Sequence, residues 1–355
     1  MLSEEAIPQR ITYVNGYGIR YLDFDNIPHK SDDYHSVILL HGIGASAERW
    51  LPVAPMLSKY FRVLVPDIVG FGYSDKPTVE YTIGFFMDFL RGFLENLRIH
   101  TPIIIGSSLG GYLATEFAIR FNTRVKKLVL AAPAGIMRSS TNVLDQYIMA
   151  ALYPTYENAL RAFMDMAFDP STVSGYTVNN FVAQMGSPNS KYAFMRTLHG
   201  IKNGPELKGR LSRIICPTLV IWGENVKMIS ANYANEYDEI SNKRLEIIEN
   251  CGHTPFAENP TKFNKAVLQF LRRAHKQYLH QCNICNVIFE CNDIIDHRPR
   301  QRQDEKEVED AHDKFREDMC KNCEKNQHLQ KEQELLFEAI DDPLKWRLKY
   351  WWLWW

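Results

Sequence analysis

Residues 102–111 read PIIIGSSLGG and lead directly into the helical stretch YLATEFAIRF at 112–121. The apolar run predicts a buried strand, and the pattern G-x-S-x-G that follows is typical of a sharp turn from a strand into a helix. Such a turn holds one side chain on a strained backbone, and glycines flank it because a Cβ there would clash with neighbouring main chain. The sequence therefore predicts that Ser108 is a nucleophile.

A second segment, upstream of Ser108, offers hydrogen-bond donors. The apolar strand SVILL at 36–40 ends in HGIG at 41–44, a flexible loop whose N–H groups can turn toward a developing oxyanion. We expect the N–H groups of Ile43 and Leu109 to be the two donors. The His41 imidazole is interpreted as a group that holds this loop by hydrogen bonds.

A histidine follows the last predicted strand of the series. The strand at 244–248 ends in ENCGH at 249–253, which places an imidazole on the loop that follows. Histidine is the commonest general base beside a serine nucleophile. We therefore expect His253 to take the proton of Ser108.

The remaining strands set the fold class. Residues 10–24 predict a hairpin with a turn at Asn15-Gly16. Alternation of nearly continuous apolar strands with helices predicts a mostly parallel sheet covered on both faces, with ligands at the carboxyl ends of the strands. The strands are expected at 37–40, 61–66, 102–105, 125–130, 217–222 and 244–248.

Together these motifs resemble the serine α/β-hydrolases over about residues 10–273. Besides the motifs above, DIVGFGYS (67–74) and IWGE (221–224) are similar to that family's pattern. The nearest resemblance is to monoacylglycerol-lipase-like enzymes, carboxylesterases and meta-cleavage-product hydrolases. It implies an α/β-hydrolase domain at 1–275, with a helical cap inserted at about 136–213. Epoxide hydrolases and haloalkane dehalogenases are disfavoured because they carry Asp where this chain has Ser108. Asp67 is interpreted as a residue that ties down a turn.

The sequence departs from the family pattern at the third member of the triad. The resemblance places the acid three residues after Gly223, where this chain has Val226, which cannot accept the imidazole N–H. The other acid position of the family follows the strand at 127–130, and residues 131–134 there carry no carboxylate. Three hypotheses stay open: Glu224, or less favourably the amide of Asn225, partners His253; an acid elsewhere does so; or Ser108 and His253 act as a dyad with reduced turnover.

The predicted cap is rich in methionine and aromatic residues. As a set they favour an apolar pocket for an acyl chain or an aromatic acid, whereas most of them individually are expected to pack the cap onto itself. These residues are Met149, Tyr153, Met164, Met166, Phe168, Phe181, Met185, Phe194 and Met195.

Composition excludes several function classes. The 355 residues are 45% hydrophobic and 23% charged, with a net charge of −1, so we expect a soluble enzyme with no nucleic-acid partner. The N-terminal residues lack the pattern of a secretion signal, and no run approaches the roughly 20 apolar residues of a membrane span. Seven cysteines with two C-x-x-C pairs suit a reducing compartment, so a cytoplasmic location is expected.

The C-terminal part differs in composition from the rest of the chain. Cys282, Cys285, Cys320 and Cys323 form two C-x-x-C pairs, which predict a structural zinc site in a module at 276–330. Cys291, His280 and His297 are alternative ligands, and free thiols are the alternative to a metal. The tail at 331–355 is expected to dock on the hydrolase domain or to join subunits of a homo-oligomer, in preference to peripheral membrane contact, and a poorly ordered C-terminus is the alternative. Its aromatic residues are Trp346, Tyr350, Trp351, Trp352, Trp354 and Trp355.

The sequence thus predicts a serine hydrolase that needs no cofactor for catalysis. Its expected substrate is a small molecule, an ester, thioester or related carbonyl compound with an apolar acyl group, and it forms an acyl-enzyme on Ser108. A carbon–carbon bond hydrolase of the meta-cleavage-product type is the alternative within the same class. A catalytically impaired binding or scaffold protein is the alternative from another class, because of Val226.

Overall fold

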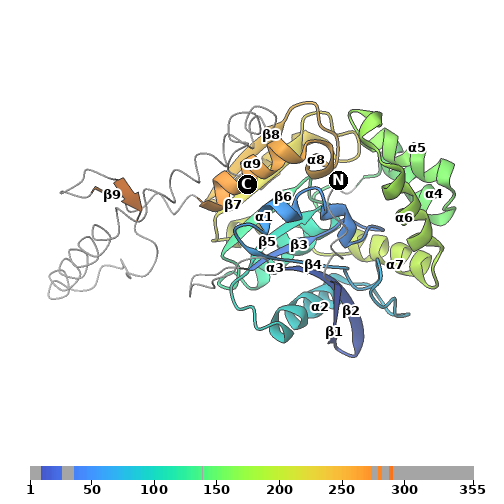
Figure 1. The fold of residues 1–355 in the computed structure, drawn as a ribbon, viewed down its shortest axis with the longest axis horizontal. Coiled ribbons are helices and arrows are strands. Elements are labelled where there is room, and N and C mark those ends of the chain that lie inside the picture. The colour runs from blue at the N-terminus through green and yellow to red at the C-terminus, as the bar shows by residue number, and fades with distance from the viewer. Residues whose placement is uncertain (1–8, 26–35, 138, 273–278, 282–287, 291–355) are drawn as a thin grey trace, which may run out of the picture. The chain divides into compact units, whose positions relative to one another are not determined.

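The computed structural model describes residues 9–25, 36–137, 139–272, 279–281 and 288–290. The chain divides into two compact units, Met1–Val267 and Leu268–Trp355. The first unit is built on an eight-stranded sheet in the order β1-β2-β4-β3-β5-β6-β7-β8 (Figure 1). These strands are β1 (Gln9–Val14), β2 (Tyr17–Phe24), β3 (Ser36–Leu40), β4 (Arg62–Pro66), β5 (Ile103–Ser107), β6 (Lys127–Ala131), β7 (Thr218–Gly223) and β8 (Lys243–Ile248).

Six strands of this sheet, from β4 to β8 in its order, run parallel to one another. The strands β3, β5, β6 and β7 are buried along almost their whole length, which explains their near-continuous apolar sequences. Strand β2 joins the series antiparallel to β4, and β1 pairs antiparallel with β2. Asn15 and Gly16 between them have φ of 51° and 87°, so the predicted hairpin turn is confirmed.

Helices pack on the sheet of the first unit. Helix α2 (Ile83–Asn96) packs against α3 (Leu109–Arg120), and α3 lies along β5 and β6. Apolar side chains of α2, among them Phe86, Leu90 and Phe93, are fully buried. The shorter helices α1 (Ala54–Leu57) and α8 (Pro255–Glu258), with α9 (Pro260–Arg272), are the other helices of the β–α alternation. The predicted fold class, a mostly parallel α/β sheet with helices, is confirmed.

Four helices gather beyond one end of the sheet (Figure 1). They are α4 (Asn142–Leu152), α5 (Tyr156–Met166), α6 (Gly175–Gly186) and α7 (Ser190–Lys202), and they lie within the stretch 136–213 that the sequence predicts to be a cap. The hydroxyls of Thr141, Thr155 and Ser174 cap the first three helices. The helices pack on one another through an aromatic cluster of Tyr147, Phe163, Phe181 and Phe194.

In the second unit the structure describes a two-stranded antiparallel sheet of β9 (Leu279–Gln281) and β10 (Ile288–Glu290). The four predicted zinc ligands, Cys282, Cys285, Cys320 and Cys323, and the Trp-rich tail at 331–355 lie outside the described residues, so both stay predictions. Within the described part of the chain, no helix is long and apolar enough to cross a membrane.

Candidate active site

Ser108 lies at the turn between β5 and α3, with φ of 51° and ψ of −115°. Residues with a Cβ seldom adopt a positive φ, so this turn is strained. Two glycines allow the chain to close on itself. A Cβ on Gly106 would lie 2.3 Å from the carbonyl oxygen of Gly110, and a Cβ on Gly110 would lie 2.2 Å from the carbonyl oxygen of Leu40. The spacing of the motif is therefore a steric requirement of the turn.

The loop after β3 is held by the buried imidazole of His41. Its Nε2 accepts a hydrogen bond from the N–H of Ile68 at 3.0 Å, which assigns the ring proton to Nδ1. That Nδ1–H donates to the carbonyl oxygen of Gly42 at 2.8 Å. The same peptide unit carries the N–H of Ile43, which points the opposite way because the peptide is trans. His41 thus fixes the direction of the predicted oxyanion donor, and burial lowers its pKa to about 4, which keeps it neutral.

The loop lies directly against the serine. A Cβ on Gly42 would lie 3.4 Å from the Cβ of Ser108, an ordinary van der Waals distance. Leu109 is the first residue of α3, so its N–H has no acceptor within the helix. The next N–H, that of Gly110, donates to the carbonyl oxygen of His41 at 3.0 Å. Among the described residues, the N–H groups of Ile43 and Leu109 have no assigned backbone acceptor, and their role as oxyanion donors stays a prediction.

A buried cluster of charged residues holds the chain that follows the loop at 41–44. The guanidinium of Arg20 pairs with Glu48 and, at 3.2 Å, with Asp67. The carboxylate of Asp67 also accepts the N–H groups of Ala47 at 2.7 Å and Tyr73 at 2.8 Å. Burial raises the pKa of Asp67 to about 6, against the opposing effect of Arg20. Asp67 thus ties together three chain segments.

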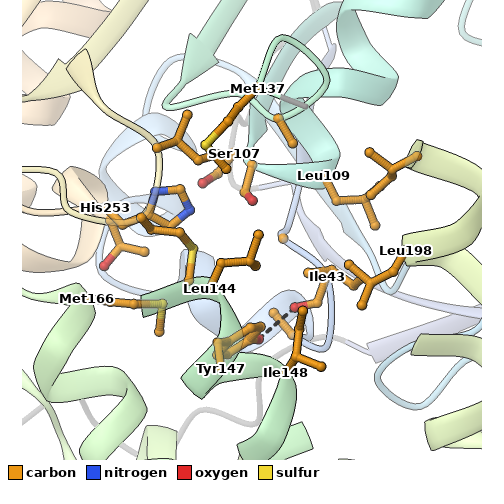
Figure 2. A pocket seen from close by; sticks show the side chains of 18 of the residues that line it. Ile43, Ser107, Leu109, Met137, Leu144, Tyr147, Ile148, Met166, Leu198 and His253 are labelled. Carbon is orange, nitrogen blue, oxygen red and sulfur yellow. Dashed lines mark hydrogen bonds between the residues drawn. The ribbon is translucent and has the colours of Figure 1, made fainter. Parts of the chain in front are cut away.

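His253 is carried by the loop after β8 and is 4% exposed. Its backbone N–H donates to the carbonyl oxygen of Met166 in the cap at 3.1 Å. The carboxylate of Glu258 accepts the N–H groups of Gly252 at 2.8 Å and Thr254 at 3.1 Å, on either side of the histidine. Figure 2 shows the imidazole directed into the cavity toward Ser107 and Leu109, the two neighbours of Ser108.

The imidazole itself is electrostatically unsupported. Neither ring nitrogen of His253 has a hydrogen-bond partner among the residues that the structure describes. Burial, and to a smaller degree the charge of Arg49, lower its pKa to about 4, so the ring is neutral near pH 7. His253 is therefore in the protonation state of a general base, but no described group is hydrogen-bonded to the ring to stabilise the imidazolium that would form.

The predicted acid, Glu224, is not brought to His253. Its side chain is exposed, and its carboxylate accepts the N–H of Asn250 at 3.5 Å. Asn225 is also exposed. Val226, at the position that the family pattern assigns to the acid, is 8% exposed. Glu224 and Asn225, the two proposed partners of the imidazole, are thus exposed to solvent, and the buried position 226 carries an apolar side chain.

Ser108, His253, Ile43 and Leu109 line a single cavity of about 270 Å³. Figure 2 labels the last three of these residues. The other walls of the cavity are mainly apolar, and of the nine cap residues expected to favour an apolar pocket, only Met166 contributes to them. Phe181, Met185 and Phe194 are buried inside the cap, and the other five are exposed. The apolar walls come from Ala45, Met137, Leu144, Tyr147, Ile148, Phe163, Met166, Leu198, Ile201, Met228, Ile229 and Phe256.

Sequence reasoning missed three residues of this site. The hydroxyl of Tyr147 in the cap donates to the carbonyl oxygen of Ile43 at 2.7 Å, shown dashed in Figure 2. Glu258 holds the histidine loop, and Arg49 places a cation at the cavity wall. A carboxylate shortly after the histidine, and a cation in the segment after HGIG, were the available sequence signals.

Comparisons with known proteins agree with this geometry. Residues 35–163 match the family described as alpha/beta hydrolase fold. A 2-hydroxy-6-oxononadienedioate/2-hydroxy-6-oxononatrienedioate hydrolase of Burkholderia vietnamiensis is 30% identical over 256 residues, which are 67% of this chain and 87% of the relative. A 2-hydroxy-6-oxo-6-(2'-aminophenyl)hexa-2,4-dienoic acid hydrolase of Metapseudomonas resinovorans is 28% identical over 282 residues, covering 76% of this chain and 93% of the relative.

A solved structure gives the same result. The meta-cleavage product hydrolase from Pseudomonas fluorescens is similar with a TM-score of 0.65 and 26% identity, covering 74% of this chain and 97% of that chain. These relatives and the matched family are hydrolases, which confirms the prediction of a hydrolase enzyme at that level. The sheet, the turn at Ser108 and these matches together establish that the chain belongs to the α/β-hydrolase family.

Proposed function

We propose that the protein is a serine hydrolase that acts on a carbonyl substrate with an apolar acyl group. The observation that carries the proposal is that Ser108, His253, Ile43 and Leu109 line one cavity. Ser108 Oγ attacks the carbonyl carbon while His253 Nε2 takes its proton, and the two backbone N–H groups bind the oxyanion. Collapse of the tetrahedral species releases the leaving group, protonated by His253, and water then hydrolyses the acyl-enzyme.

The chemistry is expected to be slow for a serine hydrolase. Loss of the orienting carboxylate from an established triad lowers kcat by roughly 10⁴, and the oxyanion hole and binding retain the rest of the catalysis. Among the described residues no carboxylate is hydrogen-bonded to a ring nitrogen of His253, which favours the dyad hypothesis over the two hypotheses with an acid partner. The proposed reaction requires only these groups and water.

Labelling with a fluorophosphonate tests the nucleophile. The full-length protein is expected to be labelled covalently, and Ser108→Ala is expected to abolish labelling. Ser107→Ala is the matched control because Ser107 precedes Ser108 and lines the same cavity. Labelling that persists in Ser108→Ala, or an unlabelled folded wild type, would refute the assignment and favour a binding protein.

A second candidate is hydrolysis of a carbon–carbon bond. The relatives from Burkholderia and Metapseudomonas are, by their names, hydrolases of 2-hydroxy-6-oxo dienoic acids. In this variant the bond that breaks lies next to a ketone, and the same oxyanion donors serve its carbonyl oxygen. Turnover of a vinylogous diketo acid without turnover of 4-nitrophenyl hexanoate would assign the carbon–carbon reaction. The opposite preference would assign the ester reaction.

A further inference from the structure

Arg49 is one of two cations, with Lys202, in the wall of a mainly apolar cavity. It lies in the short helix Ala47–Trp50 that follows the HGIG loop. Its guanidinium carbon is 5.6 Å from the ring centroid of Phe163 in the cap and 6.0 Å from that of Phe256. Its Nη1 donates to the hydroxyl of Thr177 at 3.2 Å. The side chain is therefore held by two aromatic faces and one neutral acceptor.

In the part of the chain that the structure describes, this guanidinium forms no ion pair with a carboxylate. Among the described residues none lies within the 4.0 Å of an ion pair with Arg49. Glu258 acts on it electrostatically, but the carboxylate oxygens of Glu258 accept backbone N–H groups, among them that of Phe168. Burial lowers the pKa of Arg49, which shows the cost of desolvating its charge. A guanidinium has five N–H donors, and a single acceptor leaves most of them free for a ligand.

We propose that Arg49 binds a carboxylate of the substrate. The inference rests on the proposed function and deepens it, because it makes the substrate an acid with an apolar body. A planar carboxylate fits the two parallel donors of a guanidinium, and enclosure between aromatic rings strengthens that pairing relative to water. An unpaired charge in an apolar wall is costly to the free protein, and a bound carboxylate removes that cost.

The position of Arg49 links binding to the general base. Arg49, Phe163, Met166 and Thr254 border both the main cavity and a small adjoining cavity of about 30 Å³, and Thr254 follows His253 directly. The charge of Arg49 contributes to the lowered pKa of His253. A carboxylate paired with Arg49 offsets this field, so it favours the imidazolium that forms when Ser108 attacks. Carboxylated substrates are therefore expected to have a higher kcat as well as a lower KM than their neutral counterparts.

Matched esters test the proposal through turnover. Mono-4-nitrophenyl adipate carries a carboxylate on the acyl part, and 4-nitrophenyl hexanoate is its neutral counterpart. The pair 4-carboxyphenyl hexanoate and phenyl hexanoate tests a carboxylate on the leaving part. Arg49→Met keeps the length and apolar stem of the side chain and is expected to lower kcat/KM for the carboxylated member of the preferred pair by about ten- to a hundred-fold. Neutral esters are expected to change by less than about threefold.

Two further variants separate binding from structure. Arg49→Lys keeps the charge without the planar fork and is expected to retain part of the preference. Arg161→Met removes an exposed cation from the cap and is expected to change nothing. Equal losses on charged and neutral esters in Arg49→Met would overturn the proposal, because a purely structural arginine predicts that pattern. If Arg49→Met does not fold, equal kcat/KM values of wild type on charged and neutral esters overturn it instead.

A binding assay keeps the inference independent of catalysis. Calorimetric titration of Ser108→Ala with hexanoate and with hexanamide compares a carboxylate with a neutral group on the same chain. Tighter binding of hexanoate, lost in the double variant with Arg49→Met, supports the subsite even if the protein proves to have no hydrolase activity. Turnover of neutral esters together with equal binding of both probes refutes the subsite while the proposed function stands.

Discussion

Replacement of Val226 by aspartate is the most direct test of how this site works. Val226 and aspartate have similar volumes, and the position is 8% exposed, three residues beyond Gly223 at the end of β7. The family pattern puts the orienting acid here, and Nδ1 of the buried His253 has no partner among the described groups. The introduced carboxylate is expected to accept the Nδ1–H of His253 and to raise kcat.

The magnitude follows from the pKa of His253, which is about 4 in place of 6.5. A return to the ordinary value corresponds to about 3 kcal/mol of stabilisation of the imidazolium, at about 1.4 kcal/mol per pKa unit. Such a gain raises kcat by about 10²-fold when it is realised in the transition state. If the carboxylate instead stays unpaired, burying it costs about 1–3 kcal/mol of folding stability and kcat does not rise.

The assay is steady-state hydrolysis of 4-nitrophenyl hexanoate between pH 4 and 9, with thermal unfolding measured in parallel. Val226→Asn is the matched control, since it has the same shape without the charge. In Val226→Asp the acidic limb of kcat/KM is expected to move from near pH 4 toward pH 6.5, together with the rise in kcat. A folded Val226→Asp protein with unchanged or lower kcat would refute the reasoning and show that an acid is already supplied from elsewhere.

Three other perturbations test the supporting contacts. His41→Ala is expected to lower kcat by about 10²-fold with little change in KM, because the Ile43 N–H loses its orientation; a change in KM alone would contradict this. Glu258→Gln is expected to lower kcat and to lower the free energy of unfolding, measured in urea, by about 1–3 kcal/mol. Glu224→Gln is its control at an exposed position and is expected to alter kcat by less than about twofold. Because burial holds the pKa of His41 and of His253 near 4, the unfolded chain binds protons before the native state does as the pH falls from 6.5. The free energy of unfolding is therefore expected to decrease by up to about 3 kcal/mol per histidine as the pH falls from 6.5 to 4. Asp67 partly offsets this decrease, because its raised pKa of about 6 acts in the opposite direction. A free energy of unfolding that stays constant over this range would contradict the assigned burial effects.

The parts of the fold that the sequence predicted well are those governed by local rules. The apolar strands before Ser108 and after the hairpin at Asn15-Gly16 are read from hydrophobic runs and turn chemistry, and both lie where expected. Glycine at 106 follows from a steric contact inside the turn, with Gly110, whereas glycine at 110 is required by the carbonyl oxygen of the distant Leu40. The position of the loop at 41–44 could also be predicted, because it follows strand β3, which pairs in parallel with β5.

The parts that could not be predicted depend on contacts between distant segments. Nothing local distinguishes Met166, which lines the cavity, from Met164, which is exposed on the same helix, because the packing of neighbouring cap helices decides it. The bond from Tyr147 to Ile43 joins residues 104 positions apart. Glu224 lies two residues before the position that the family pattern gives to the acid, and only tertiary structure sets the direction of its side chain.

The hydrogen bond between Tyr147 and Ile43 joins the cap to the loop that carries a predicted oxyanion donor. Under the proposed function, α4 contributes to the substrate cavity and the loop at 41–44 supplies an oxyanion donor, and the hydroxyl of Tyr147 in α4 bonds to Ile43 in that loop. Any displacement of α4 is transmitted to the peptide next to the oxyanion donor. Grafting a relative's cap onto this chain would therefore change turnover along with selectivity, and directed evolution of the cap would have to retain the phenol to keep its rate.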